Sequence, residues 1–221
     1  MDFGLMYRTI PFFLGGAGVT VSITVLSTLL GTALGILVAV GRVRGGRITS
    51  KVAFSYVTVT RGVPLLVQIF IVYYGLNTLV NVSPLFAGIL ALGICTAGYL
   101  AEAIRAGIMS VSRGQFEASS SLGLSEGQTM RVVVLPQALR NAIPAMGNEF
   151  ITMLKASSLV SVISVVELTR VAYQLKQGTA RPIEMYINAA ILYLLMTTLF
   201  VKGLSEVEKR LGIPRQTIGK T

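Results

Sequence analysis

Residues that commonly carry out catalysis are scarce in this sequence. It has no histidine, which removes the commonest metal ligand and general base, and its single cysteine, Cys95, cannot form an intrachain disulfide. The stretch Gly212–Thr221 contains glycines, a lysine and a threonine, but six residues separate its outer glycines where a phosphate-binding P-loop has four, and no helix follows. We therefore predict that this chain holds no metal and no cofactor, and that it does not hydrolyse ATP itself.

A second group of candidate residues is polar and lies in a stretch that is otherwise apolar. Hydrophobic residues make up 53% of the chain and charged residues 13%. Soluble proteins have roughly 25% charged residues, so this composition indicates a membrane protein. Polar groups are costly at membrane depth and therefore mark candidate functional positions. The candidates for a substrate pathway are Asn148, Glu149, Lys155, Ser157 and Ser161.

The spacing of these polar residues predicts which of them can pair or share a helix face. Glu149 and Lys155 lie six positions apart, so on one helix they point in different directions and each needs its own partner. Ser157, Ser161 and Ser164 are predicted to share a helix face. That face either lines a cavity or packs closely against a neighbouring helix. We favour packing, because small residues most often have that role in membrane helices.

Uncharged runs define the helices that must position these residues. The run Pro11–Gly41 is longer than the apolar core of a signal peptide, about 7–15 residues, and is expected to stay in the bilayer. The run Gly62–Ala101 is about twice as long as one span requires, and the polar segment Asn77–Pro84 is expected to turn it back. We predict an all-α protein with a single membrane domain and five transmembrane helices, at residues of about 12–40, 60–80, 84–106, 138–166 and 185–204.

The distribution of basic residues predicts the orientation of these helices. The segment Gly41–Lys51 carries three arginines and a lysine with no acid, whereas Asn77–Pro84 carries no charge. By the positive-inside rule the first segment is cytoplasmic, which places the N-terminus outside and the C-terminus in the cytoplasm. The net charge of +10 could suggest nucleic acid, but the basic residues flank apolar runs. We therefore expect membrane lipid around the chain and no nucleic-acid partner.

A polar segment at residues of about 110–136 separates the third and fourth predicted spans. Residues Gln115–Leu122 favour a short helix, which Gly123 would close in a left-handed conformation. Ser125 and Gln128 fit a capping box that opens a second short helix, and Pro136 is expected in the first turn of the next one. These signals predict a compact loop, but by themselves they fit any cytoplasmic hairpin equally well.

The spacing within this segment resembles the EAA loop of ABC-importer permeases, in which E-A-A, three residues, G and nine residues precede I-x-L-P. The matching positions are Glu117, Ala118, Gly123, Val133, Leu135 and Pro136. Ser119 replaces the second alanine and Val133 replaces the isoleucine, and both changes keep the size or branching of the side chain. Residues 61–76, 98–108 and 135–170 are similar to the branch of this family that takes up polar amino acids and opines, whose subunits have five spans.

The resemblance implies that this loop is a coupling helix in a groove of a separate ATPase subunit, a helix-in-groove mode of recognition. The residues implied in coupling are Phe116, Glu117, Ala118, Ser119, Leu122 and Gly123. Ala118 and Ser119 would permit close approach and Phe116 and Leu122 would act as anchors. Glu117 would pair with an arginine of the ATPase or accept hydrogen bonds from backbone N–H groups of its own subunit. The second is slightly favoured, because exposed ion pairs contribute little.

The same resemblance implies the partners and the location. Two ATP-binding cassette subunits would hold ATP and Mg²⁺, and an extracytoplasmic solute-binding protein or domain would deliver a polar amino acid or an amino-acid-like solute. A second permease subunit, identical or homologous, would complete the translocation path. The expected location is the bacterial inner membrane. Many relatives have an acidic residue where this chain has Ala156, which weakens the case for a cationic amino acid as substrate.

Three further charged residues have structural interpretations. Glu102 and Arg105 lie three positions apart at the inner end of the third predicted span and are expected to form an ion pair. Arg61 is interpreted as an interfacial anchor, with a role in gating as the alternative.

Two other functional classes have weaker support in the sequence. An intramembrane protease or a lipid-modifying enzyme would need paired catalytic groups at membrane depth, and the chain offers few such residues. An ion channel would need a repeated polar or carbonyl lining, and the sequence has no clear candidate for one.

Overall fold

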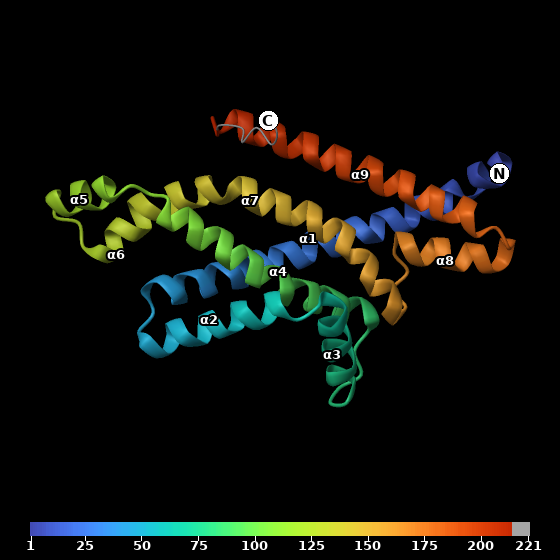
Figure 1. Cartoon of the computed structure of the whole chain (residues 1–221), viewed down its shortest axis with the longest axis horizontal. Coiled ribbons are helices and arrows are strands. Elements are labelled where there is room, and N and C mark those ends of the chain that lie inside the picture. Colours follow the sequence, from blue (N-terminus) through green and yellow to red (C-terminus); the bar gives the residue numbers. More distant parts are fainter. Residues whose placement is uncertain (214–221) are drawn as a thin grey trace.

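The computed structural model describes residues 1–213 as an elongated bundle of helices (Figure 1). Residues 214–221, which include most of the glycine- and lysine-containing stretch at the C-terminus, lie outside the described part. No strand occurs among residues 1–213, which confirms the predicted all-α class. The helices are α1 (Phe3–Arg44), α2 (Arg47–Gly62), α3 (Leu65–Asn77), α4 (Pro84–Met109), α5 (Arg113–Ser121), α6 (Glu126–Gln128), the π-helix η1 (Thr129–Val134), α7 (Leu135–Ala156), the 3₁₀-helix η2 (Ser157–Ile163), α8 (Leu168–Thr179) and α9 (Pro182–Arg210).

Helices α1, α4 and α9 are each long and apolar enough to cross a membrane. Two bent helical pairs also qualify if each is counted as one broken span. The first joins α2 to α3 at an angle of 108°, and the second joins residues 126–163 to α8 at 48°. The described part of the chain therefore contains three to five candidate spans, and the predicted number of five corresponds to counting both bent pairs.

The core of the bundle is the packing of α1 against α4. Glycines allow this packing: a Cβ atom on Gly31 would lie 2.8 Å from the side chain of Thr96, and one on Gly93 would lie 2.6 Å from Leu30. Small residues allow the backbones of membrane helices to approach closely, where dispersion forces hold them together. The long apolar runs that predicted these two spans therefore also carry the residues that bring them into contact.

The bend between α2 and α3 was not predicted from the sequence. Pro64 is the N-cap of α3 and has no backbone N–H, so the helical hydrogen bonding cannot continue through it. The side-chain amide of Gln68 donates to the carbonyl oxygens of Thr60 and Val63, both at 2.8 Å, and so satisfies carbonyl groups that the break leaves free. Tyr56 donates to the carbonyl oxygen of Ile94 at 2.7 Å, which holds α2 against α4.

A second junction that the sequence did not reveal joins α8 and α9. The Glu167 side chain is fully buried and accepts hydrogen bonds from the backbone N–H groups of Thr169 and Arg170, at 2.9 and 2.7 Å. It also accepts a hydrogen bond from the Tyr193 hydroxyl on α9 at 2.8 Å. The same carboxylate therefore caps the N-terminus of α8 and connects it to α9.

Candidate coupling loop and substrate pathway

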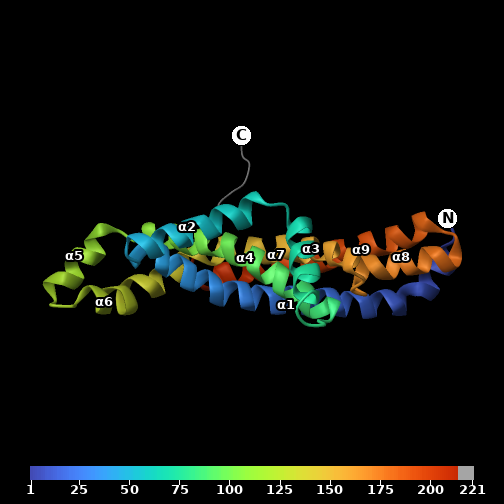
Figure 2. The same cartoon turned by 90° about the horizontal axis from the view of Figure 1, so that it is seen from below.

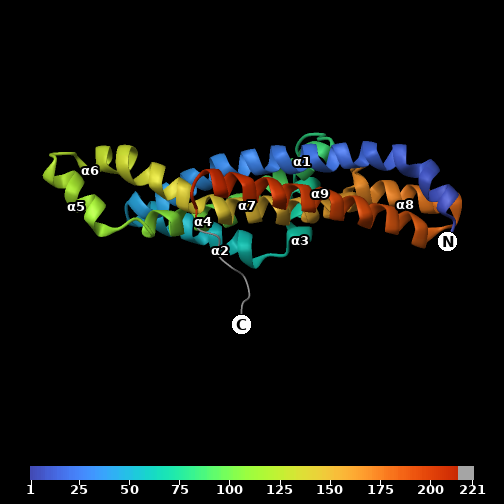
Figure 3. The same ribbon diagram turned by 90° about the horizontal axis from the view of Figure 1, so that it is seen from above.

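The segment between α4 and α7 forms a protrusion at one end of the bundle, with the N-terminus of the chain at the opposite end (Figures 1 and 2). We call α5 and α6 with their connection, residues 113–128, the α5–α6 protrusion. The view from the other side shows the same arrangement, with α5 and α6 beyond the ends of α1, α4 and α9 (Figure 3). This segment therefore extends beyond the packed part of the long helices.

Gly123 closes α5 as the sequence predicted. Its φ is +74°, in the left-handed region that favours glycine. The Leu124 N–H donates to the Ser119 carbonyl oxygen at 3.1 Å, and the Gly123 N–H donates to the Ser120 carbonyl oxygen at 3.0 Å. These two bonds form a Schellman motif, which satisfies carbonyl groups that the end of a helix leaves free.

The predicted capping box at the start of α6 is also present. The Ser125 hydroxyl accepts a hydrogen bond from the Gln128 N–H at 3.3 Å, and the Gln128 side-chain oxygen accepts one from the Ser125 N–H at 2.9 Å. Pro136 lies in the first turn of α7, as the sequence predicted, but α7 is not separated from the helix before it. The helix that Ser125 opens continues through η1 into α7, and the Leu135 N–H bonds to the carbonyl oxygen of Met130, five residues back. This wider turn accommodates the proline, whose ring would clash in a regular α-helix.

The residues predicted for coupling divide between two sides of the protrusion. Phe116 packs against the buried cluster that includes Met130 and Val134, and Ser119 is 3% exposed with its hydroxyl donating to the Gln115 carbonyl oxygen. The outward-facing residues are Glu117, Ala118, Leu122 and Gly123. Phe116 and Ser119 therefore hold the protrusion against its own chain, while the outward-facing residues are available to a partner.

Glu117 does not cap its own subunit. Among the described residues its carboxylate has no hydrogen-bond or ion-pair partner, and its side chain is exposed. The alternative that the sequence analysis slightly favoured, acceptance of backbone N–H groups within the chain, is therefore wrong for this structure. Leu122, which follows at the end of α5, is 81% exposed. The protrusion therefore exposes both an acid and a large apolar side chain.

The residues predicted for a substrate pathway differ in their exposure. Asn148 and Lys155 are exposed on α7, Ser161 is half-buried, and Ser157 is fully buried with its hydroxyl donating to the Leu154 carbonyl oxygen at 2.8 Å. The prediction that the serines share one face is wrong. The α-helix ends at Ala156, so the following residues adopt the tighter 3₁₀ geometry and the spacing of an α-helix no longer applies.

Glu149 differs from the other pathway candidates because its carboxylate is partly buried without a hydrogen-bond partner among the described residues. Its residue is half-buried, and its carboxylate oxygen Oε1 is buried without a hydrogen-bond partner within the described structure. Near the end of α2, the Arg61 guanidinium lies 5.3 Å from the centroid of the Tyr99 ring of α4. Arg61 therefore joins α2 to α4, a contact that the interpretation as an interfacial anchor did not include.

The predicted ion pair of Glu102 and Arg105 is present, with the Arg105 Nε donating to the carboxylate at 3.0 Å. Arg42 donates to the other carboxylate oxygen from the end of α1. Arg42 was not predicted as a partner, because it lies 60 positions away and no local spacing connects the two residues. The ion pair is therefore a three-residue network that joins α1 to α4.

Curated sequences similar to this chain are transport permeases. The chain is 39% identical over 208 residues to the nopaline transport system permease protein of Agrobacterium fabrum, an alignment that covers 89% of this chain and 86% of the relative. It is 35% identical over 215 residues to the glutamine transport system permease protein of Escherichia coli, covering 96% and 98%. It is 36% identical over 213 residues to an arginine transport system permease protein of Bacillus subtilis, covering 96% and 97%.

Solved structures show the same architecture. A chain of an amino acid ABC transporter crystallised with histidines superposes with a TM-score of 0.90 at 43% identity, covering 95% of this chain and 99% of that chain. A chain of the inward-facing methionine ABC transporter MetNI superposes with a TM-score of 0.79 at 21% identity, covering 96% of this chain and 99% of that chain. This second likeness shows the fold alone. Neither comparison supports the alternative of a membrane enzyme.

The family match covers most of the membrane domain. It runs from residue 31 within α1 to residue 210 at the end of α9, and so includes the α5–α6 protrusion and the Glu149 region. This family comprises membrane subunits of transporters, which agrees with the apolar helices described above. The chain belongs to the family of inner membrane components of binding-protein-dependent transport systems.

Proposed function

We propose that this chain is the permease subunit of an ATP-driven importer for a polar amino acid or an amino-acid-like solute. The observation that carries the proposal is the family match over residues 31–210 together with the α5–α6 protrusion. The names of three relatives, which transport nopaline, glutamine and arginine, support a substrate with an amino-acid backbone. ATP and Mg²⁺ would be held by two ATP-binding cassette subunits, and a solute-binding protein or domain would deliver the substrate.

We further propose that the α5–α6 protrusion is the coupling element. Leu122 would enter an apolar groove of the ATPase, and the unpartnered carboxylate of Glu117 would meet a basic residue beside that groove. Ala118 is exposed and lies between them in the sequence, so its small side chain would let the backbone of α5 approach the ATPase closely. In this arrangement the protrusion would lie in the cytoplasm, with the N-terminus of the chain outside and the C-terminus inside, as the positive-inside rule predicts.

The translocation path would run between this chain and a second permease subunit, identical or homologous. Glu149 is the strongest candidate to face it, because a buried carboxylate oxygen without a partner has lost its hydration and gains by meeting a polar ligand. Arg61, Asn148, Lys155 and Ser161 would complete the polar part of the path. Ser157 is the weakest candidate, since its hydroxyl is buried and already bonded within its own helix.

The experiment that tests this function is reconstitution of the complete importer in proteoliposomes. The chain is expected to co-purify with an ATPase, and hydrolysis of ATP should rise when a binding protein loaded with glutamine, arginine or nopaline is added. The substrate that gives both stimulation and uptake identifies the transported class. A solubilised chain that brings no ATPase with it, under conditions in which it remains folded, would contradict the proposal.

A further inference from the structure

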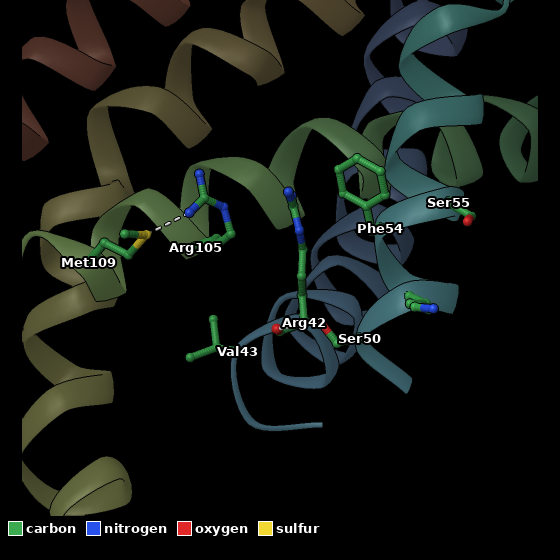
Figure 4. Close-up of a pocket in the computed structure, with 8 residues that line it drawn as sticks. Arg42, Val43, Ser50, Phe54, Ser55, Arg105 and Met109 are labelled. Atoms are coloured by element: carbon green, nitrogen blue, oxygen red, sulfur yellow. Dashed lines mark hydrogen bonds between the residues drawn. The ribbon is translucent and has the colours of Figure 1, made fainter. Parts of the chain in front are cut away.

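Beyond transport, the structure contains a basic cavity at one end of the membrane helices that has no role in the proposed function. The cavity has a volume of about 700 Å³ and lies where the end of α1, the beginning of α2 and the end of α4 meet (Figure 4). This volume falls in the usual range of small-molecule sites, about 300–1,000 Å³. Its lining consists of Arg42, Val43, Ser50, Lys51, Phe54, Ser55, Arg105 and Met109.

Positive charge is in excess at this cavity. Arg42, Lys51 and Arg105 line it, and Glu102 is the acid that pairs with both arginines. Three cations and one carboxylate leave two positive charges in excess. Lys51 is exposed, and its ammonium has no hydrogen-bond or ion-pair partner in the described part of the chain. The site is therefore electrostatically suited to an anion.

The arginines retain unused hydrogen-bonding capacity. A guanidinium has five N–H donors, whereas Glu102 engages one donor atom of Arg42 and two of Arg105. The Arg105 Nη1 lies 2.6 Å from the sulfur of Met109, a weak acceptor (Figure 4). In the same view Arg42 extends between Arg105 and Phe54, and its guanidinium lies 5.1 Å from the centroid of the Phe54 ring. An oxyanion would offer these N–H groups a better acceptor than a thioether.

The depth of the cavity points to lipid. Arg42 is the first charged residue after the uncharged run Pro11–Gly41, and Glu102 is the first after the run Gly62–Ala101. Both helices thus leave the hydrocarbon at the level of the cavity, where phospholipid phosphates lie. The rim is apolar and open: Val43 is 39% exposed, Phe54 54% and Met109 69%. A single site therefore offers cations for a headgroup and an apolar border for acyl chains.

We propose that this cavity binds the headgroup of an anionic phospholipid. Its phosphate diester would accept hydrogen bonds from Arg42, Arg105 and Lys51, while the acyl chains would lie along Phe54 and the neighbouring apolar surface of α2. Basic pockets between membrane helices are a known type of site for anionic headgroups. The proposal requires that α1 and α4 cross the bilayer, and it does not depend on which amino acid the protein transports. The bound lipid would link α1, α2 and α4 near the N-terminal end of α2, away from the α2–α3 bend.

The test measures lipid binding to the complete, detergent-solubilised importer by native mass spectrometry. Phosphatidylglycerol should bind at least tenfold more tightly than phosphatidylcholine, whose headgroup has no net charge. Lys51→Gln should weaken phosphatidylglycerol binding about fivefold, which corresponds to about 1 kcal/mol for one cation near an anionic headgroup. Since Lys51 is exposed and unpaired within the described chain, this variant should assemble normally. Arg47→Gln is the matched control, because it removes the same charge from the same segment but does not line the cavity.

Three results would overturn the proposal. Equal loss of binding in Arg47→Gln and Lys51→Gln would show that general surface charge attracts the lipid. Displacement of phosphatidylglycerol by millimolar inorganic phosphate would identify a free anion as the ligand. Loss of a protein subunit from the complex in Lys51→Gln would show that the cavity is a protein interface. Preferential binding of phosphatidylglycerol that Lys51→Gln alone weakens, and that phosphate does not compete away, supports a lipid site.

Discussion

Replacement of Gly123 by valine should uncouple ATP hydrolysis from transport. The glycine has a φ of +74°, and an added Cβ would have no heavy atom within 4 Å. Within the described chain the new Cβ atom meets no neighbour, so the expected effect of Gly123→Val comes from backbone strain. A residue held in a disfavoured backbone region costs about 1–3 kcal/mol, and a β-branched residue is among the worst in the left-handed region.

This strain acts on the end of α5. Relief of the strain would break the Schellman bonds from Gly123 to Ser120 and from Leu124 to Ser119. Leu122 and the connection to α6 would then change direction, whereas the packing of α1 against α4 would not be affected. We expect Gly123→Val to insert and assemble normally, but to lose uptake and the stimulation of ATP hydrolysis by loaded binding protein.

The assay compares ATP hydrolysis in proteoliposomes with and without loaded binding protein. Gly123→Asn is the matched control, because asparagine tolerates the left-handed region and should retain most of the stimulation. Ser125→Ala removes the hydroxyl of the capping box and should have a weaker effect in the same direction, since loss of a cap costs about 1 kcal/mol. Wild-type stimulation in Gly123→Val, or equal loss in Gly123→Asn, would refute the reasoning that the geometry of this turn couples the subunits.

Three other variants test different parts of the structure. Arg44→Cys in a Cys95→Ala background should react with impermeant thiol reagents from the cytoplasmic side alone, because the positive-inside rule places this segment there. Lys155→Met should lower uptake in an assembled importer, because its exposed ammonium would lose its role in the substrate path. Tyr193→Phe should lower the free energy of unfolding of the solubilised protein by about 1–2 kcal/mol, because it removes the hydrogen bond to Glu167. The measurement is the shift of the unfolding midpoint.

Each of these variants has a contrary result. Labelling of Arg44→Cys from outside would invert the topology and remove the α5–α6 protrusion from any cytoplasmic ATPase. Full activity of Lys155→Met would mean that this side chain extends to a membrane interface without contacting substrate. For Tyr193→Phe, the matched control is Tyr7→Phe, whose side chain is 76% exposed. Equal destabilisation by the two changes would indicate that the Glu167 hydrogen bond contributes nothing of its own.

Local signals in the sequence predicted the geometry of the α5–α6 protrusion well. Gly123 and Ser125 act on hydrogen bonds within a few residues of themselves, so their effect can be read without knowledge of the fold. Local reasoning also placed Pro136 in the first turn of α7, but it did not reveal the π-helix before the proline and it failed at the serines after Ala156. In both places the helix changes its pitch, which a fixed period of 3.6 residues cannot describe.

The sequence by itself determined the membrane environment, the helical class and the caps of the protrusion, because these depend on composition and on neighbours along the chain. Tertiary structure alone decided which distant residues meet: Arg42 with Glu102, and Glu167 with Tyr193. It also decided that Phe116 faces its own chain while Leu122 faces outward. A hydrophobic period locates a helix in the bilayer, but its rotation and contacts are set by packing against other helices, and that packing is not encoded in any local spacing.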